Sequence, residues 1–366
     1  MKVSVIGVGK LGLCFSLTLE KNGYDVLGLD VNPQYVESLN SRTFKSAEQG
    51  VNELLGSANN FKATLSLEDI IDHSSVLFVV VATPSLPNGR YDHSQVDGLV
   101  QSLKDLGPQK NNKELVICCT TMPGYCDQIQ EQVKDLNYVV SYNPEFIAQG
   151  TILNDQAKPD MVLIGEGSED SGDLLEEIYR NHTENDPRIC RMSPLEAEVT
   201  KIALNCFLTT KIAYANMVGD IVRKAGGNQD KVLSAIGEDT RIGGKYLRYG
   251  YGYGGPCFPR DNRALALYAG DLGVEALISL ASDASNKNHL QYQVEEYINT
   301  HNVNDPVSFD YITYKPESTL LEESQQLEFA VGIARHGFKV TIKERQEVVE
   351  ELRNTYGDLF IYEVRT

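Results

Sequence analysis

A single cysteine, Cys257, stands in a stretch that glycine and proline dominate, GYGYGGPCFP at residues 250–259. Such a segment cannot bury a thiol in a helix or a strand, and its flexible backbone lets a ligand approach closely. Arg260 and Asp261 follow, and a nearby cation favours the thiolate, which is the nucleophilic form of cysteine. Two interpretations stay open, a catalytic nucleophile and a structural cysteine.

A lysine and an asparagine, Lys201 and Asn205, are four residues apart in a long helical pattern over residues 193–227. This spacing places both side chains on one face of a helix. Ser193 and Glu196 form a capping box at its start, and about 32 residues at about 1.5 Å each make a helix of roughly 48 Å. A lysine facing a cleft beside an asparagine could stabilise an oxyanion, whereas the plainer interpretation is a lysine facing solvent.

A glycine-rich motif, GVGKLG, follows the apolar run at residues 3–6 and opens a helical pattern. Asp30 ends the next apolar run, 18 residues after the motif. Glycines in this position let backbone N–H groups and a helix N-terminus approach a pyrophosphate, while the carboxylate accepts from ribose hydroxyls. Because Asp30 would repel a 2′-phosphate, we expect NAD rather than NADP. The candidate contacts in the motif are Gly7, Val8, Gly9, Lys10, Leu11 and Gly12.

Three further loops come directly after apolar runs, at the strand ends where open parallel sheets bind ligands. They are ATPS at residues 82–85, CTTMPG at 119–124 and NPEFIAQG at 143–150. Thr and Pro in such loops are often simple turn residues, and most loop glutamates are solvated. Glu145 in the third loop is nevertheless a candidate acid or base.

Strand and helix patterns alternate along the first 190 residues or so, which predicts an α/β fold with a doubly wound parallel sheet. The expected strands lie at residues 3–6, 26–30, 76–81, 115–119, 138–142, 161–165 and 188–192, and most of them are nearly continuous apolar runs. Helical pattern covers residues 193–227 and then about 260–300. The tail reads strand, helix, strand, helix, strand over residues 307–314, 323–337, 339–343, 346–357 and 359–364.

Length and composition exclude several classes of protein. The 366 residues suggest two or three domains, and the net charge of −18 would repel nucleic acid and anionic membranes. Seven scattered cysteines without a CxxC pair and six dispersed histidines predict neither disulfides nor a metal site. With no signal peptide or membrane span in the pattern, we expect a cytoplasmic protein.

Seven motifs together resemble the UDP-glucose/GDP-mannose dehydrogenase family, in order along residues 1 to about 295. They are GVGKLG, VATP, TTMPG, NPEFIAQGTILND, AEVTKIALNCFLTTKIAYAN, DTRIGGKYL and GYGYGGPCFPRD. The cysteine motif is highly specific. Within the family, the GGxCFP[KR]D form and the NPEF loop look most like the UDP-glucose branch.

The resemblance implies a fold of three parts. These are a Rossmann NAD-binding domain at residues 1–192, a central long-helix region for dimerisation and catalysis at 193–300, and a UDP-binding α/β domain at 301–366. The last part ends about two strands early, so we expect it to be abbreviated. A homodimer through the central helix would follow.

The resemblance also implies a reaction, the four-electron oxidation of a sugar C6 alcohol to a carboxylate with two NAD. Cys257 would attack the aldehyde intermediate and then hold a thioester until water releases it. Lys201 and Asn205 would stabilise oxyanions, and Thr121 and Asp261 would position a water. Glu145 would serve hydrolysis, and the product, UDP-glucuronate, would enter polysaccharide synthesis.

Binding residues are implied in the same way. Besides the glycine motif and Asp30, the expected NAD contacts are Thr83, Pro84, Thr121 and Gln149. The expected nucleotide-sugar contacts are Glu145, Phe146, Lys201, Asn205, Arg248, Tyr249, Tyr251, Gly252, Gly254, Tyr314 and Lys315. Arg241 would reach the substrate of a partner subunit.

The chain departs from the family pattern at three positions. Gln149 stands where the family has a second glutamate and cannot take a proton, so hydrolysis would rest on Glu145. Arg260 replaces a lysine and keeps the charge. Glu322 replaces an arginine and reverses the charge.

Three alternatives remain beside oxidation of UDP-glucose. A neighbouring enzyme would oxidise GDP-mannose or a UDP-N-acetylhexosamine. A two-electron β-hydroxyacid dehydrogenase shares the glycine motif and a Lys-xxx-Asn pair, but has no use for Cys257. A relic that binds NAD and nucleotide sugar without full turnover would fit Gln149 and Glu322.

Overall fold

The computed structural model describes residues 1–147, 150–316 and 318–365. The chain divides into two compact units, Met1–Lys201 and Ile202–Thr366. The boundary falls within one continuous helix, α9 (Pro194–Lys224). The division into three domains at residues 192 and 300 stays a prediction.

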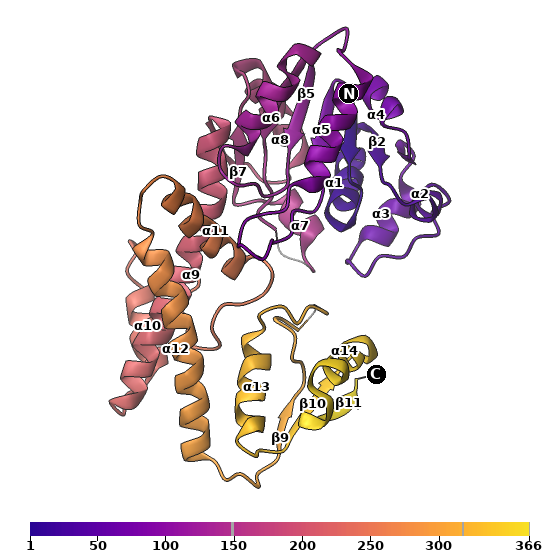
Figure 1. Cartoon of the computed structure of the whole chain (residues 1–366). Coiled ribbons are helices and arrows are strands. Elements are labelled where there is room, and N and C mark those ends of the chain that lie inside the picture. Colours follow the sequence, from indigo (N-terminus) through magenta and orange to yellow (C-terminus); the bar gives the residue numbers. More distant parts are fainter. Residues whose placement is uncertain (148–149, 317, 366) are drawn as a thin grey trace. The chain divides into compact units, whose positions relative to one another are not determined.

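An eight-stranded sheet forms the centre of the first unit (Figure 1). The order of its strands is β3-β2-β1-β4-β5-β6-β7-β8. The strands are β1 (Lys2–Ile6), β2 (Asp25–Leu29), β3 (Phe61–Thr64), β4 (Val76–Val79), β5 (Lys113–Ile117), β6 (Tyr138–Tyr142), β7 (Met161–Gly165) and β8 (Arg188–Met192). The α/β prediction is confirmed, because β3 to β6 all run parallel. Strand β7 pairs antiparallel with β6, so the sheet is not parallel throughout. The short strand β3 was missing from the sequence-based prediction.

Helices connect these strands. They are α1 (Lys10–Lys21), α2 (Pro33–Asn40), α3 (Val51–Ser57), α4 (Leu67–His73), α5 (Ser94–Leu106), α6 (Tyr125–Val133), α7 (Ile152–Ala157) and α8 (Glu169–His182), with a 3₁₀ turn η1 (Lys134–Leu136). The order of the first six strands reverses direction between β1 and β4, which are neighbours in the sheet. Ligands of doubly wound folds bind at the carboxyl ends of strands at this point.

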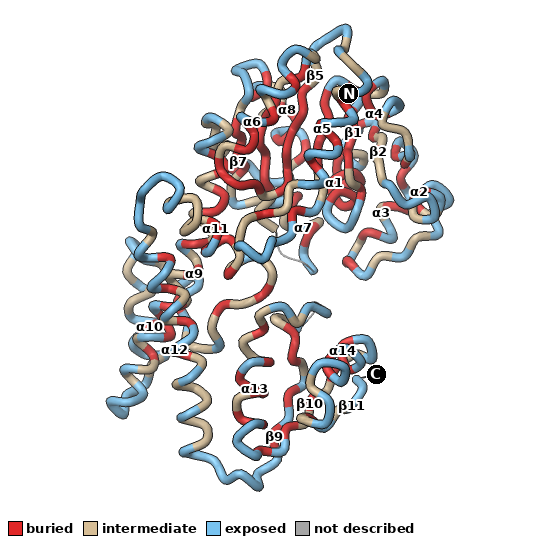
Figure 2. The backbone as a smooth tube through the Cα atoms, in the orientation of Figure 1, coloured by how far each residue is buried: buried red, intermediate tan, exposed pale blue. Residues whose placement is uncertain are grey.

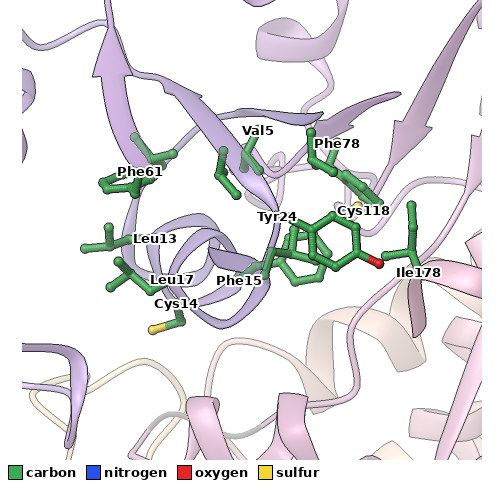
Figure 3. Packing of buried hydrophobic residues seen from close by; sticks show 14 of the residues in the cluster. Val5, Leu13, Cys14, Phe15, Leu17, Tyr24, Phe61, Phe78, Cys118 and Ile178 are labelled. Atoms are coloured by element: carbon green, nitrogen blue, oxygen red, sulfur yellow. The ribbon is translucent and has the colours of Figure 1, made fainter. Parts of the chain in front are cut away.

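The first unit's core lies on both faces of the sheet. Every residue of β4 is buried, and so are the last four residues of β1 and of β5, as the red strands of Figure 2 show. On one face, Phe15 of α1 packs edge to face on Phe78 of β4, with ring centroids 4.9 Å apart (Figure 3). This packing fixes α1, and therefore the glycine turn that precedes it, against the sheet.

Long helices dominate the first part of the second unit. After α9 come α10 (Gln229–Gly237), α11 (Phe258–Asp271) and α12 (Leu277–Thr300). The Ser193–Glu196 capping box is present, since the Ser193 N–H donates to Glu196 Oε2 at 2.9 Å. The hydroxyls of Thr210 and Ser282, 3.1 Å apart, join α9 to α12.

The C-terminal part is a three-stranded parallel sheet in the order β11-β10-β9. Its elements are β9 (Val307–Phe309), α13 (Gln325–Arg335), β10 (Val340–Glu344), α14 (Gln346–Tyr356), η2 (Gly357–Leu359) and β11 (Ile361–Val364). The strand predicted over residues 307–314 stops at Phe309. The reason is that the buried Glu344 carboxylate accepts from the Ile312 N–H at 3.0 Å, which takes this segment out of the ladder.

No helix among the described residues is both long and apolar enough to cross a lipid bilayer.

Candidate active site

The glycine turn after β1 has the geometry that a dinucleotide needs. Gly7 has φ +92°, and a Cβ there would lie 2.5 Å from the Val80 carbonyl oxygen. A Cβ on Gly12 would lie 2.0 Å from the Gly7 carbonyl oxygen, so helix and strand could not approach as they do. A Cβ on Gly9 would meet nothing within 4 Å, which leaves the N-terminus of α1 open to a pyrophosphate. The turn therefore fits NAD.

The carboxylate and the other side chains around this turn are also in place. Asp30 directly follows β2, is partly buried, and accepts from the Asn32 N–H at 3.0 Å. Val8 is buried under Gly28, and Leu11 is about one third exposed. The Lys10 ammonium lies 3.6 Å from Glu48, at the start of α1.

Glu48 is a positioning residue that sequence reasoning missed. It is 3% exposed and accepts from the backbone N–H groups of Gly150 at 3.0 Å and Ile152 at 2.9 Å. It thereby joins the end of the NPEFIAQG loop to Lys10 of the glycine motif. Gln149, the expected NAD contact in this loop, lies outside the described residues.

The loops after β4 and β5 are joined to each other. Thr83 is buried, and its hydroxyl donates to the Thr120 carbonyl at 2.8 Å, while Pro84 is exposed. The second of these loops is fixed in turn by a buried carboxylate on α9, Glu198. That residue accepts from the Thr121 hydroxyl at 2.8 Å, the Gly124 N–H at 2.6 Å and the Cys126 N–H at 2.9 Å.

Glu198 was also missing from the sequence-based set of site residues. Burial raises the pKa of its carboxyl, and the three hydrogen bonds oppose that shift. Thr121 itself is fully buried, and its hydroxyl donates its hydrogen bond to Glu198. The expected role of Thr121 beside a water stays a prediction.

Lys201 lies one turn of helix after Glu198 and contacts the loop after β6. Its ammonium donates to the Glu145 carbonyl at 2.6 Å and lies 4.3 Å from the centre of the Phe146 ring. Burial raises the pKa of the Glu145 carboxyl to about 7, and the charge of Lys201 limits this rise. A carboxyl with that pKa can both take and give a proton near neutral pH.

In the second unit, Cys257 is the N-cap residue of α11 and is exposed. This position places the thiol near the positive end of the helix dipole, and its sulfur makes no cap hydrogen bond with the helix backbone. Asp261, in the first turn of the same helix, is fully buried. Its carboxylate accepts from the Asn205 amide at 2.6 Å and from the Arg260 guanidinium at 3.0 Å. The structure thus joins Asn205 and Asp261 directly.

Three of the four glycines in the loop before Cys257 lie against another segment, whereas a Cβ on Gly250 would meet nothing within 4 Å. A Cβ on Gly252 would lie 2.2 Å from the Asn286 side chain, and one on Gly254 would lie 2.1 Å from the Glu323 carbonyl. Gly255 has φ +79° and lies against the Tyr314 ring. Any larger residue at these positions would displace the loop.

The remaining expected substrate residues lie at the surface of the second unit. Tyr251 is 40% exposed, with its ring 5.9 Å from that of Phe329. Arg248 and Tyr249 line an open groove of about 860 Å³ between α10 and residues 244–249. The Lys315 ammonium lies 5.5 Å from the Tyr314 ring.

Arg241 is paired with Asp239 through two hydrogen bonds, of 3.0 and 2.7 Å, and is highly exposed. Its side chain points into solvent and does not enter a site formed by the described residues of this chain.

The expected site residues therefore form two sets. The first unit holds the NAD motif with Thr83, Thr121, Glu145, Phe146 and Lys201. The second unit holds Asn205, Cys257, Asp261 and the glycine loop. Among the described residues, no group of three or more His, Cys, Asp or Glu side chains is placed to hold a metal ion.

Comparison with known proteins gives both units relatives. Residues 1–183 match the NAD binding domain, and residues 195–288 the central domain, of the UDP-glucose/GDP-mannose dehydrogenase family. In Pseudomonas aeruginosa, UDP-glucose 6-dehydrogenase is 29% identical over 93% of this chain and 78% of its own length. GDP-mannose 6-dehydrogenase of the same organism is 28% identical, over 94% of this chain and 81% of its own length.

A solved structure agrees with these relatives. A UDP-glucose dehydrogenase from Pyrobaculum islandicum is 30% identical, covers 99% of this chain and 85% of its own, and superposes with a TM-score of 0.85. The glycine turn has the form that NAD requires, and the family model over it is that of an NAD-binding domain. The chain belongs to the UDP-glucose/GDP-mannose dehydrogenase family, the NAD-dependent dehydrogenases of nucleotide sugars.

Proposed function

We propose that the protein is a UDP-glucose 6-dehydrogenase, which oxidises the sugar C6 alcohol to a carboxylate through a thioester on Cys257. The observation that carries the proposal is the position of this thiol. It is the one exposed cysteine of the seven, all of which lie in the described residues, and it occupies the N-cap position of α11. Burial raises the pKa of Cys14, Cys119 and Cys206 to about 12, so these thiols stay protonated and inert.

The chemistry balances over two oxidations. When bound, NAD supplies the acceptor for one hydride in each of them. In the first, C6 loses a hydride and its hydroxyl loses a proton, which leaves an aldehyde. The Cys257 thiolate then adds to the aldehyde carbon, and loss of a second hydride from the adduct leaves a thioester. Water displaces the sulfur, giving the carboxylate and restoring the thiol.

Polar and charged residues of the site are assigned roles in these reaction steps. The Lys201 ammonium stabilises the oxyanion of the adduct, as electrostatic stabilisation of acyl-transfer states requires. Asn205 contributes its amide, and the buried Asp261 that it contacts takes part in proton transfer through a water, with Thr121. Glu145, with a pKa of about 7, is the base that activates water for hydrolysis.

Substrate binding is assigned to residues at the glycine loop. The main chain of residues 249–254 approaches the nucleotide sugar at Gly250, where a Cβ would meet nothing within 4 Å. Arg248, Tyr249, Tyr251, Tyr314 and Lys315 supply cations and aromatic faces for a nucleoside diphosphate, and Phe146 lines the sugar's side.

A homodimer is part of the proposal. Helix α9 has an exposed apolar stripe with a spacing of about seven residues, and its members are Phe207 (66% exposed), Tyr214 (48%), Met217 (42%) and Ile221 (60%). An apolar stripe of this kind fits a second copy of the chain. Arg241, which points into solvent, would then reach the partner's substrate.

Oxidation of GDP-mannose is the second candidate, because the two P. aeruginosa relatives are almost equally similar to this chain, at 28% and 29% identity. The test measures NADH formed per sugar with UDP-glucose, GDP-mannose and UDP-N-acetylhexosamines. Two NADH per UDP-glucose, with UDP-glucuronate formed, supports the proposal. Turnover of GDP-mannose alone moves the assignment to the second candidate.

A binding relic is distinguished by calorimetry. The departures Gln149 and Glu322 motivate this alternative; Glu322 is exposed, and its backbone carbonyl accepts from the Gly255 N–H at 3.1 Å. Binding of NAD and UDP-glucose without any rise in NADH absorbance would overturn the enzymatic proposal.

A further inference from the structure

A histidine outside the expected site, His289 on α12, contacts the main chain of the glycine loop at Gly250. It is 2% exposed, and each of its two ring nitrogens faces an acceptor. Nδ1 lies 2.8 and 3.0 Å from the two carboxylate oxygens of Asp220 on α9. Nε2 lies 2.7 Å from the Gly250 carbonyl oxygen.

These contacts restrict how protons are placed on the ring. A carbonyl oxygen has no proton to give, and neither has an ionised carboxylate, while a neutral imidazole donates through one nitrogen only. In a neutral ring, one nitrogen carries no proton. Its lone pair would then face an oxygen lone pair of either the ionised Asp220 carboxylate or the Gly250 carbonyl, at 3 Å or less. With a proton on both nitrogens, both contacts become hydrogen bonds and the Asp220 charge is balanced.

We propose that His289 is a positioning residue that carries a proton on both ring nitrogens and thereby joins Asp220 to the main chain of the 249–254 loop. Gly250 is the point of attachment. Its carbonyl also accepts from the Gln293 amide at 3.1 Å, and its N–H donates to Asn216 at 3.0 Å. The loop is therefore held between α9 and α12.

Other charged and titratable groups around the ring support this arrangement. The Tyr249 hydroxyl donates to Asp220 at 2.9 Å, and its ring lies 5.3 Å from the His289 ring. Burial, followed by the Asp220 contact, raises the pKa of Tyr249, so it remains a donor. On the far side of Tyr249, Arg223 is 5.6 Å from its ring and pairs with Glu296 at 2.8 Å. The cation of Arg223 is thus already paired, and Asp220 is the anion that faces His289.

Loss of one ring proton has a direct consequence for the loop. The ring would then keep either Asp220 or Gly250, and the other contact would become repulsive. Tyr249, Tyr251 and Gly252 flank Gly250, and under the proposed function they hold the nucleotide sugar. The inference that His289 affects substrate binding rests on that proposal, whereas the protonation of the ring and the order of the loop do not.

The first test needs no substrate. Nitrogen-15 NMR, with the His289 signals assigned from His289→Gln, follows both ring nitrogens through a pH series. Hydrogen exchange of the amides from Tyr249 to Gly255 is measured at the same pH values. We expect both ring nitrogens to carry protons wherever the loop amides are protected. The protection factors, which compare each exchange rate with its intrinsic value at the same pH, should fall about tenfold as one proton leaves. Loop protection that persists with a singly protonated ring would overturn the proposal.

The second test measures turnover. In the same pH series, KM for the nucleotide sugar should rise about tenfold in step with the loss of the ring proton, with kcat changing less. His289→Gln, which can donate to one partner only, should start at the higher KM and lose this pH dependence. His301→Gln alters an exposed histidine beyond the end of α12 and should behave like the unchanged protein. If His289→Gln retained the original KM and pH profile, the positioning role would be wrong.

Failure of the proposed function has a different signature. A protein that oxidises no nucleotide sugar would still show the NMR and exchange results, if His289 holds the loop. Normal turnover with a loop that is indifferent to His289 would refute the inference alone.

Discussion

Replacing Glu198 by glutamine tests whether the loop after β5 is positioned from α9. The carboxylate accepts three hydrogen bonds, from Thr121, Gly124 and Cys126, two of them on Oε1 and one on Oε2. In Glu198→Gln, one of these oxygens becomes an NH₂ group. The smallest change places the NH₂ toward the Gly124 N–H, 2.6 Å from the original oxygen, so that two donors face each other.

The magnitude follows from that one lost contact. A hydrogen bond to a charged group contributes about 1.5–3 kcal/mol. Replacing the carboxylate also removes a buried charge, which offsets part of this loss in the free energy of unfolding. The reason is that burial raises the pKa of Glu198 and so disfavours its ionised form. We therefore expect a loss of about 1–2 kcal/mol in the free energy of unfolding. If the loop moves with Gly124, kcat/KM should fall about tenfold or more, because about 1.4 kcal/mol of transition-state stabilisation corresponds to a factor of ten.

The matched control is a buried carboxylate on the large sheet itself. Glu114 in β5 accepts from the hydroxyls of Ser141 and Ser171, which can rotate to accept from a glutamine amide. Glu114→Gln should therefore lose less stability and leave kcat/KM within about twofold. Urea unfolding and steady-state kinetics with both substrates measure the two effects. Equal kinetics for the two variants would refute the positioning role of Glu198.

Three more predictions concern Glu145, His182 and Gly12. Because the pKa of Glu145 is about 7, the rate of thioester hydrolysis should rise as pH increases through 7. Glu145→Gln should slow hydrolysis by about 10²–10⁴ and flatten its pH profile in stopped-flow measurements. An unchanged profile in this variant would argue against Glu145 as the base. Burial lowers the pKa of His182 to about 4 from 6.5, so the unfolded chain takes up a proton that the folded chain does not. Stability should therefore fall by at most about 3 kcal/mol as pH drops from 6.5 to 4; His182→Leu should lose this slope in urea titrations, and a retained slope would contradict the assignment. Gly12→Ala would place a Cβ 2.0 Å from the Gly7 carbonyl, so calorimetry should show NAD binding weakened at least tenfold, whereas Gly56→Ala, which meets nothing within 4 Å, should bind normally.

The features that could be predicted from the sequence are those with local signals. The glycine turn, the capping box at Ser193 and the length of α9 each depend on residues a few positions apart, and each is present in the structure. Seven of the eight strands of the large sheet were predicted, and the clearest apolar runs belong to central strands such as β4 and β5, whose residues are buried on both faces. The four-residue strand β3 was missed, since its alternating burial gives no continuous apolar run.

The residues that were missed have partners distant in the sequence. Glu198 lies 77 residues from Thr121, and Glu48 lies 102 residues from Gly150. A lone glutamate carries no sign that its carboxylate will be buried on the N–H groups of a remote loop. His289 was only one of six dispersed histidines in the sequence, because its role appears only where Asp220 and Gly250 meet.

The most direct measurement is mass spectrometry of the Cys257 peptide after an acid quench during turnover of UDP-glucose with NAD. An acyl adduct on Cys257 is expected, together with two NADH per UDP-glucuronate and no UDP-glucuronate from Cys257→Ala. An unmodified Cys257, with UDP-glucuronate formed at the full rate by Cys257→Ala, would contradict covalent catalysis by this thiol.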